Sequence, residues 1–176
     1  MLFAEAVMSL QATVFSTKLG WFGLVGEKNC VWRLVMGHRT AAEAWARLHR
    51  DFADETLVES DWYPALRKKL EEFAAGKRIS FDKIRVRTEH RTPFHQQVIL
   101  ATRAIGFGET LSYGELAARA GSPNAARAVG TVMAKNDVPI IIPCHRVLAS
   151  GGKIGGFSAP QGIDLKRRLL DLEANA

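Results

Sequence analysis

The chain has 176 residues, of which 47% are hydrophobic and 24% are charged, so it can form one ordinary core, or one core with a small second lobe. Lys and Arg number 24 against 18 Asp and Glu, which gives a net charge of +6 and favours a polyanionic partner such as nucleic acid. The first ten residues lack the basic start of a signal peptide, and no apolar run approaches the ~20 residues that span a bilayer. These features argue against a membrane protein and predict a cytoplasmic one.

The cysteine content argues against two further classes. Only Cys30 and Cys144 are present, and no CxxC pair occurs. A disulfide framework and a Cys-rich zinc site are therefore disfavoured, and we expect neither a metal nor a cofactor. Few cysteines suit a reducing compartment, where a lone thiol stays free to react.

The first half of the chain is predicted to be a mixed α and β scaffold. Three strands are expected, joined in one case by a tight turn over residues 26–29. Two helices follow, one capped by Thr40 with Glu43 completing a capping box, and one stopped by Gly76. Nothing in this half has the spacing of a catalytic site. The predicted strands are 11–15, 19–25 and 31–36, and the predicted helices run to Phe52 and from Trp62 to Ala75.

A change of character near residues 88–92 suggests a lobe boundary. Residues 78–89 are polar and alternating, which predicts a strand and a linker. Thr92-Pro93 then opens a helix, because proline at the first helical position loses no hydrogen bond. Its apolar stripe would be Phe94, Val98, Ala101 and Ile105. We therefore divide the chain into a scaffold lobe, 1–90, and a second lobe, 91–176.

A helix-turn-helix pattern follows. Ser112 and Glu115 form a capping box that begins a helix over 113–120, which Gly121 ends. Ser122-Pro123 is predicted to open a second helix over 123–135. Small residues fill its front apart from Arg127, so it reads little base sequence but allows close approach to a nucleic-acid backbone. Arg127 suits a phosphate or insertion into the base stack. Tight packing of the same small residues in a core explains them equally well.

The segment 138–147 carries the clearest chemical signal. Ile140–Ile142 is predicted to be a short buried strand or extended run, and Pro143 keeps Ile142 out of the helical region. Cys144 and His145 follow. A thiol with a pKa of ~8.5 is mostly protonated at neutral pH, and a histidine can accept its proton directly or through one water. Glu173 on the last helix is the candidate to orient the imidazole. The alternative is that Cys144 is a small buried hydrophobe.

These residues resemble a known family. Pro143-Cys144-His145-Arg146-Val147, with the preceding isoleucines, is similar to the signature of the methylated-DNA–protein-cysteine methyltransferases, the 6-O-alkylguanine-DNA alkyltransferases. The similarity runs from about Thr92 to Glu173 and includes Ser112-Tyr113, residues 125–130, Asn136 and Val138-Pro139. It implies an α+β fold with a small N-terminal α/β lobe containing an antiparallel sheet. The second lobe would be mainly helical, carry the helix-turn-helix and the reactive cysteine, and enter the minor groove of DNA.

The resemblance also implies roles for individual residues. Cys144 would accept the alkyl group, with His145 as its base through a water and Glu173 orienting His145. Tyr113 would donate to N3 of the departing guanine. Arg127, with Ala126 beside it among the DNA-binding residues, would fill the gap left by a flipped nucleotide. Ser158 and the backbone at Val147 would hold the base, and Asn136 would brace the turn before the cysteine. Phe157 departs from the tyrosine of many members.

The expected activity is therefore single-use repair of double-stranded DNA containing 6-O-methylguanine, with 4-O-methylthymine as a further candidate, by a monomer. The product thioether has no electrophilic carbonyl for water to attack, so the cysteine would not be regenerated. Two rival hypotheses are a non-catalytic sensor or regulator that binds DNA through the helix-turn-helix, and a cysteine hydrolase, which would need an oxyanion hole. Candidate phosphate contacts are Arg103, Arg119, Arg127, Lys135 and Lys153, although a solvated surface charge is the favoured interpretation of all of them except Arg127. Residues 166–168 are expected on the exposed face of the last helix, opposite leucines that pack inward.

Overall fold

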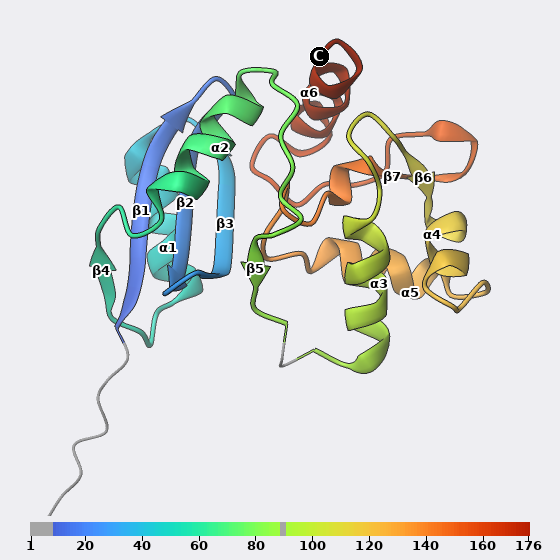
Figure 1. The fold of residues 1–176 in the computed structure, drawn as a ribbon, viewed down its shortest axis with the longest axis horizontal. Coiled ribbons are helices and arrows are strands. Elements are labelled where there is room, and N and C mark those ends of the chain that lie inside the picture. Colours follow the sequence, from blue (N-terminus) through green and yellow to red (C-terminus); the bar gives the residue numbers. More distant parts are fainter. Residues whose placement is uncertain (1–8, 89–90) are drawn as a thin grey trace, which may run out of the picture.

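The computed structural model describes residues 9–88 and 91–176. Figure 1 shows the sheet and its helices beside a second part of the molecule that is mainly helical. The sheet has five strands in the order β4-β1-β2-β3-β5. Its three central strands are antiparallel, and the short edge strands β4 and β5 pair in parallel. The strands are β1 Leu10–Thr17, β2 Gly20–Glu27, β3 Cys30–His38, β4 Leu57–Glu59 and β5 Arg85–Val86.

The three predicted central strands are confirmed, with ends one or two residues longer in most cases. The turn between β2 and β3 is shorter than predicted and contains only Lys28 and Asn29. Gly26 and Glu27 belong to β2, where they pair with Val31 and Cys30. A side chain at residue 26 would lie 2.2 Å from the carbonyl oxygen of Cys30, so glycine is required by the close strand approach.

Helices α1 (Ala41–Asp51) and α2 (Pro64–Ala74) pack on opposite faces of the sheet. Thr40 caps α1 as predicted, but the Glu43 side chain accepts from the backbone of Arg39 instead of that of Thr40. Half of the predicted capping box is therefore present. Helix α2 begins two residues later than expected, because Pro64 occupies its first position.

The helix-turn-helix is formed by α4 (Tyr113–Arg119) and α5 (Ala126–Ala134), beside α3 (Pro93–Arg103). Thr92 caps α3, and both halves of the Ser112–Glu115 capping box are present on α4. The predicted start of α5 at Pro123 is wrong. The backbone N–H of Ala125 donates to the carbonyl of Ser122, which closes a turn. The fixed φ of proline suits the second position of such a turn as well as a helix start, and the turn is formed here.

The predicted extended run at 140–142 is also wrong, although these isoleucines are buried. Ile140 has φ 69°, and the N–H of Ile141 donates to the carbonyl of Pro139, so the backbone reverses in a γ-turn. The N–H of Ile142 donates to the carbonyl of Val138. A β-branched residue in this region costs about 1–3 kcal/mol, which the burial of all three isoleucines against the sheet and α2 can offset.

The chain ends with α6 (Gly162–Ala174), which follows the short strand β7 (Val147–Leu148) and two 3₁₀ turns, η1 (Cys144–Arg146) and η2 (Ser150–Gly152). Strand β7 pairs in parallel with β6 (Leu111–Ser112). Lys166 was expected on the exposed face of α6, but its side chain is buried and donates to the carbonyl of Val147 at 2.6 Å. Arg167 and Arg168 are exposed, as expected.

One hydrophobic cluster joins the sheet to the second half of the chain. It contains Phe22 and Phe73 from the first half and Ile141 and Leu165 from the second. The predicted lobe boundary near 88–92 includes residues 89 and 90, which lie outside the described residues. Among the described residues no helix is long and apolar enough to cross a membrane. The predicted α+β class with a sheet-containing N-terminal half is confirmed.

Candidate active site

The Cys144 thiol lies at the start of η1, directly after the γ-turn and Pro143. Cys144 is only 7% exposed, yet it lines a cavity of about 650 Å³. Residues from both halves of the chain surround this cavity. They include Arg33–Met36 and His38 of β3, Tyr113, Gly130, Met133–Asp137 and Gly156–Pro160.

Asn136 fixes the thiol from the end of α5. Its amide nitrogen Nδ2 donates to Cys144 Sγ at 3.0 Å and to the carbonyl of Ile142 at 2.8 Å. Its Oδ1 accepts from the backbone N–H of Val138 at 3.1 Å, which determines which end of the amide faces the sulfur. An N–H directed at sulfur favours the thiolate over the thiol. The predicted bracing residue therefore lies against the turn and also contacts the sulfur.

The side chains of His145, which follows the cysteine in the chain, and Glu173 form a buried pair. His145 Nε2 and Glu173 Oε1 are 2.8 Å apart, and both side chains are almost completely buried. His145 Nδ1 is buried and has no hydrogen-bond partner among the described residues. With Nε2 held as the N–H by the carboxylate, Nδ1 is left as the ring nitrogen that can accept a proton. The structure thus pairs the predicted histidine with the predicted glutamate, and this histidine directly follows Cys144 in the chain.

Arg146 completes this buried group and was not singled out from the sequence. Its guanidinium donates from Nε and NH2 to the Glu173 carboxylate, at 2.8–3.2 Å, and from NH1 to the carbonyl of Ile105. The N–H of Gly108 also donates to Glu173, at 2.9 Å. Every lone-pair region of the carboxylate is therefore engaged, as a buried charge requires.

Burial and these contacts set the protonation states. Burial raises the pKa of the Cys144 thiol, against the opposing effects of Asn136 and Lys166. Burial also lowers the pKa of His145, although Glu173 acts in the other direction. For Glu173 burial opposes ionisation, but the hydrogen bonds from His145 and Arg146 prevail and lower its pKa to about 2. The resting site therefore holds a neutral thiol, a neutral imidazole and a carboxylate at neutral pH.

Tyr113, the first residue of α4, lines the same cavity as Cys144. Burial raises the pKa of the Tyr113 phenol, and the nearby Cys144 raises it further by a smaller amount. The hydroxyl therefore stays protonated and can donate a hydrogen bond. A side chain at residue 155 would lie 3.2 Å from the Tyr113 hydroxyl oxygen, so Gly155 allows the loop to approach the ring closely. Gly130 of α5 faces the other part of the ring. Neither glycine was singled out from the sequence as a support for Tyr113.

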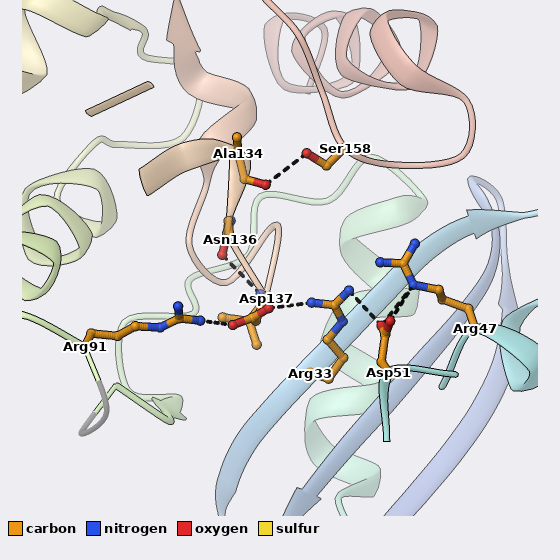
Figure 2. A network of polar contacts seen from close by, with 9 residues as sticks. Arg33, Arg47, Asp51, Arg91, Ala134, Asn136, Asp137 and Ser158 are labelled. Carbon is orange, nitrogen blue, oxygen red and sulfur yellow. Dashed lines mark hydrogen bonds and ion pairs between the residues drawn. The ribbon is translucent and has the colours of Figure 1, made fainter. Parts of the chain in front are cut away.

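Of the remaining predicted residues, Ser158 lines the cavity, and the other three are not among the described residues that line it. Ser158 lines the cavity, is exposed and donates to the carbonyl of Ala134, as Figure 2 shows. Val147 is fully buried and is not among the described residues that line the cavity. Ala126 is partly exposed in the first turn of α5, and Arg127 beside it is exposed.

Arg103 does not present a free cation, contrary to the expectation that it could reach a phosphate. Its NH2 donates to the carbonyls of Phe81, Asp82 and Ile84, which ties α3 to the segment before β5. Burial lowers the pKa of its guanidinium. Lys166 was mispredicted in the same way, because a lysine beside two arginines indicates a solvated face by pattern alone, yet it too donates to a backbone carbonyl. No local signal identifies either contact.

Comparison with known proteins agrees with this geometry. Residues 93–175 match the family model described as 6-O-methylguanine DNA methyltransferase, DNA binding domain. The chain is 39% identical over 123 residues to the methylated-DNA–protein-cysteine methyltransferase of Metallosphaera sedula, covering 70% of this chain and 75% of that protein. It is 32% identical over 161 residues to the constitutive enzyme of Bacillus subtilis, covering 92% and 93%.

Solved structures extend the similarity to the whole fold. The Mycobacterium tuberculosis OGT, solved in complex with DNA, superposes with a TM-score of 0.76 at 33% identity and covers 94% of this chain and 93% of that one. The enzyme of Pyrococcus kodakaraensis gives 0.71 at 27% identity, covering 92% and 98%. Because the relationship spans nearly the full length at more than 30% identity, this chain belongs to the methylated-DNA–protein-cysteine methyltransferase family.

Proposed function

We propose that this protein repairs alkylated DNA directly, by transferring the alkyl group from O6 of guanine to Cys144 Sγ. The observation that carries this proposal is the buried thiol at the edge of a cavity, held by Asn136 and followed by a His145–Glu173 pair. A neutral thiol needs a base at the moment of attack, and the pair supplies one. Membership of the family gives the same activity, a methylated-DNA–protein-cysteine S-methyltransferase.

The reaction is a displacement at the alkyl carbon. The S–C bond forms as the C–O6 bond breaks, and the thiol proton passes through a water to Nδ1 of His145, whose imidazolium the Glu173 carboxylate stabilises. Tyr113 donates its proton to N3 of the leaving guanine, which relieves the negative charge on the base, and the proton held by His145 then returns through water to the Tyr113 oxygen. The product is a thioether, which water does not hydrolyse. Each molecule therefore acts once.

The substrate base must leave the duplex to reach a thiol that is buried in a cavity. Flipping a nucleotide costs a few kcal/mol, and a side chain that fills the vacated space offsets part of this cost. Arg127 and Ala126, on the exposed start of α5, are proposed to approach the minor groove and fill that space. Ser158 and the backbone carbonyl of Val147, which can accept a second hydrogen bond besides that from Lys166, are proposed to hold the flipped base.

The wider expectations follow from this chemistry. The proposed partner is double-stranded DNA containing 6-O-methylguanine, and the protein is proposed to act as a monomer. Residues 1–90 would form the scaffold lobe, and 91–176 would bind DNA and accept the alkyl group. A free acceptor thiol requires a reducing compartment, so we propose that the protein is cytoplasmic.

Intact mass spectrometry tests the proposal. The protein is mixed with a duplex that contains one 6-O-methylguanine, and we expect a stoichiometric gain of about 14 Da that peptide mapping assigns to Cys144. Cys144→Ser should abolish the gain, and Cys30→Ser, at the other and only partly buried cysteine, should preserve it. Absence of the gain with tight binding of the duplex would favour the non-catalytic sensor. Absence of both would refute repair and DNA recognition together.

A further inference from the structure

A network of ion pairs links the sheet to the segment that holds the thiol (Figure 2). Asp137 lies at its centre, and each of its two carboxylate oxygens forms an ion pair with an arginine. Arg33 NH1 of β3 lies 2.5 Å from Oδ1, and Arg91, just before α3, contacts Oδ2. The backbone carbonyl of Asp137 also accepts from the N–H of Leu34 at 2.9 Å. Three contacts from two distant parts of the chain therefore fix this one residue.

The sheet side of the network is itself anchored. Arg33 NH2 lies 2.7 Å from Asp51 at the end of α1, and Asp51 is also held by Arg47 at 2.9 Å. Arg33 projects from β3 opposite Val25 of β2, and β5 pairs with the beginning of β3 at Cys30 and Val31. The arginine therefore rests on a rigid strand and a helix end, so it can hold Asp137 in one place.

Asp137 directly follows the residue that contacts the sulfur. Asn136 reaches Cys144 Sγ only because its backbone is placed between the end of α5 and the γ-turn, where its N–H donates to the carbonyl of Met133. Hydrogen-bond strength falls steeply with distance and angle, so a small shift of this backbone would weaken the contact with sulfur. The position of Asp137 therefore decides the quality of that contact.

We propose that Asp137 is a positioning residue for the acceptor thiol, acting through Asn136 and held in place by Arg33 and Arg91. This inference rests on the proposed role of Cys144. It assigns the N-terminal sheet a part in tuning the reaction, because Arg33 lies 104 positions before Asp137 in the sequence. Loss of the ion pairs of Asp137 with Arg33 and Arg91 should make the thiol less reactive, although no group that touches the substrate has changed.

Two effects of removing the carboxylate have opposite signs, which makes the proposal testable. Without Asp137 the guanidinium of Arg91 would lose this anionic partner and that of Arg33 would keep only Asp51, so the positive charge in the wall of the cavity that Cys144 also lines would rise and favour the thiolate. A displaced Asn136 would disfavour it. The other titratable or charged groups near the thiol or in the cavity wall are Lys166, His145, Tyr113, His38, Arg47 and Lys135.

The first test measures alkylation of Cys144 by iodoacetamide across a range of pH in a Cys30→Ser background. For Asp137→Asn we expect the pH midpoint to rise by about one unit, so that the rate at neutral pH falls by up to about tenfold. Asp137→Ala, which removes both acceptor oxygens, should shift the midpoint at least as far. An unchanged or lowered midpoint would overturn the proposal. Asp61→Asn, which breaks an ion pair with Arg67 on α2, is the matched control and should leave the profile unchanged.

A double-variant comparison tests the route through Asn136. Asn136→Ala alone should slow the iodoacetamide reaction, and adding Asp137→Asn should slow it little further, because both changes remove the same contact. Additive losses would refute action through Asn136. Methyl transfer from the duplex is measured in parallel on the parent protein. Failure of that transfer would refute the proposed function, while the iodoacetamide profiles would still decide the role of Asp137.

Discussion

Two carboxylates, Glu173 and Asp137, each bind two cationic or polar side chains, but they do so in different surroundings. The Glu173 side chain is 1% exposed, and its partners His145 and Arg146 are 0% and 9% exposed. The Asp137 side chain is 35% exposed, and its partners Arg33 and Arg91 are 18% and 19% exposed. Both carboxylates are close to the segment 138–147 that carries the thiol, since Asp137 directly precedes it and Glu173 contacts His145 and Arg146 near its end.

The difference in burial assigns them different roles. Ion pairs that water reaches contribute little net free energy, because solvent screens them and replaces lost partners. A buried pair leaves a stranded charge when one member is removed. We therefore expect Glu173 to matter for stability and chemistry together, and Asp137 to matter mainly for the geometry of Asn136.

The largest expected effect is that of Glu173→Gln. It would leave Arg146 buried without its anion, so the free energy of unfolding should fall by about 3–5 kcal/mol, measured by urea denaturation. Methyl transfer should slow by about 10²-fold or more, because His145 loses the group that stabilises its protonated form. Glu173→Asp, which keeps the charge, is the control and should retain part of both. A stability loss below about 1 kcal/mol would remove the distinction between the two carboxylates.

Acid should probe the buried group selectively. The ordinary pKa of a glutamate is 4.5, and that of Glu173 is lowered to about 2, so its contribution is complete above pH 4.5 and is lost as the pH falls towards 2. The lowered pKa of His145 acts in the same direction from about pH 6.5 downwards, because only the unfolded state takes up its proton readily. Denaturation at a series of pH values should show this decline, and Glu173→Gln should flatten its lower part. An unchanged slope in the variant would contradict the assignment.

Lys166 extends the comparison to a buried side chain of opposite charge, a cation that acts on the Cys144 thiol. Its Nζ donates to the carbonyl of Val147, and its charge lowers the pKa of Cys144 against the effect of burial. For Lys166→Met we expect the iodoacetamide rate of Cys144 at neutral pH to fall up to about tenfold. The free energy of unfolding should change by less than about 2 kcal/mol, since losing a charge-assisted hydrogen bond is offset by relief of desolvation. Arg167→Met, on the exposed face of α6, is the control.

The smallest expected effect on stability is that of Asp137→Asn. Its pairs are partly exposed, so the free energy of unfolding should fall by no more than about 1 kcal/mol. The deficit should shrink further at high salt, which screens the pairs in the parent protein. Thermal denaturation at low and high salt would measure both. A loss of several kcal/mol would mean that Asp137 holds the two halves of the chain together and is not chiefly a positioning residue.

Local signals predicted much of the fold and the core of the site. The Ser112–Glu115 capping box, the Thr92-Pro93 helix start and the three-strand meander depend on residues close together in sequence, and all are present. The Cys144-His145 pair was predicted from adjacency and from the family resemblance. Where a local signal suits two structures, sequence reasoning failed, as at Pro123, which forms a turn where a helix was predicted.

The sequence by itself thus determined most of the elements and the family, and it predicted Cys144 as the reactive thiol, because these inferences depend on neighbouring residues. Tertiary structure alone decided that Ile140 adopts a γ-turn, that Lys166 is buried and that Arg103 binds backbone carbonyls. It also decided that Arg33 grips Asp137 across 104 positions. Each of these depends on which distant groups the fold packs against one another. Such proximity is a product of packing the sheet against the second half of the chain, and no local pattern encodes it.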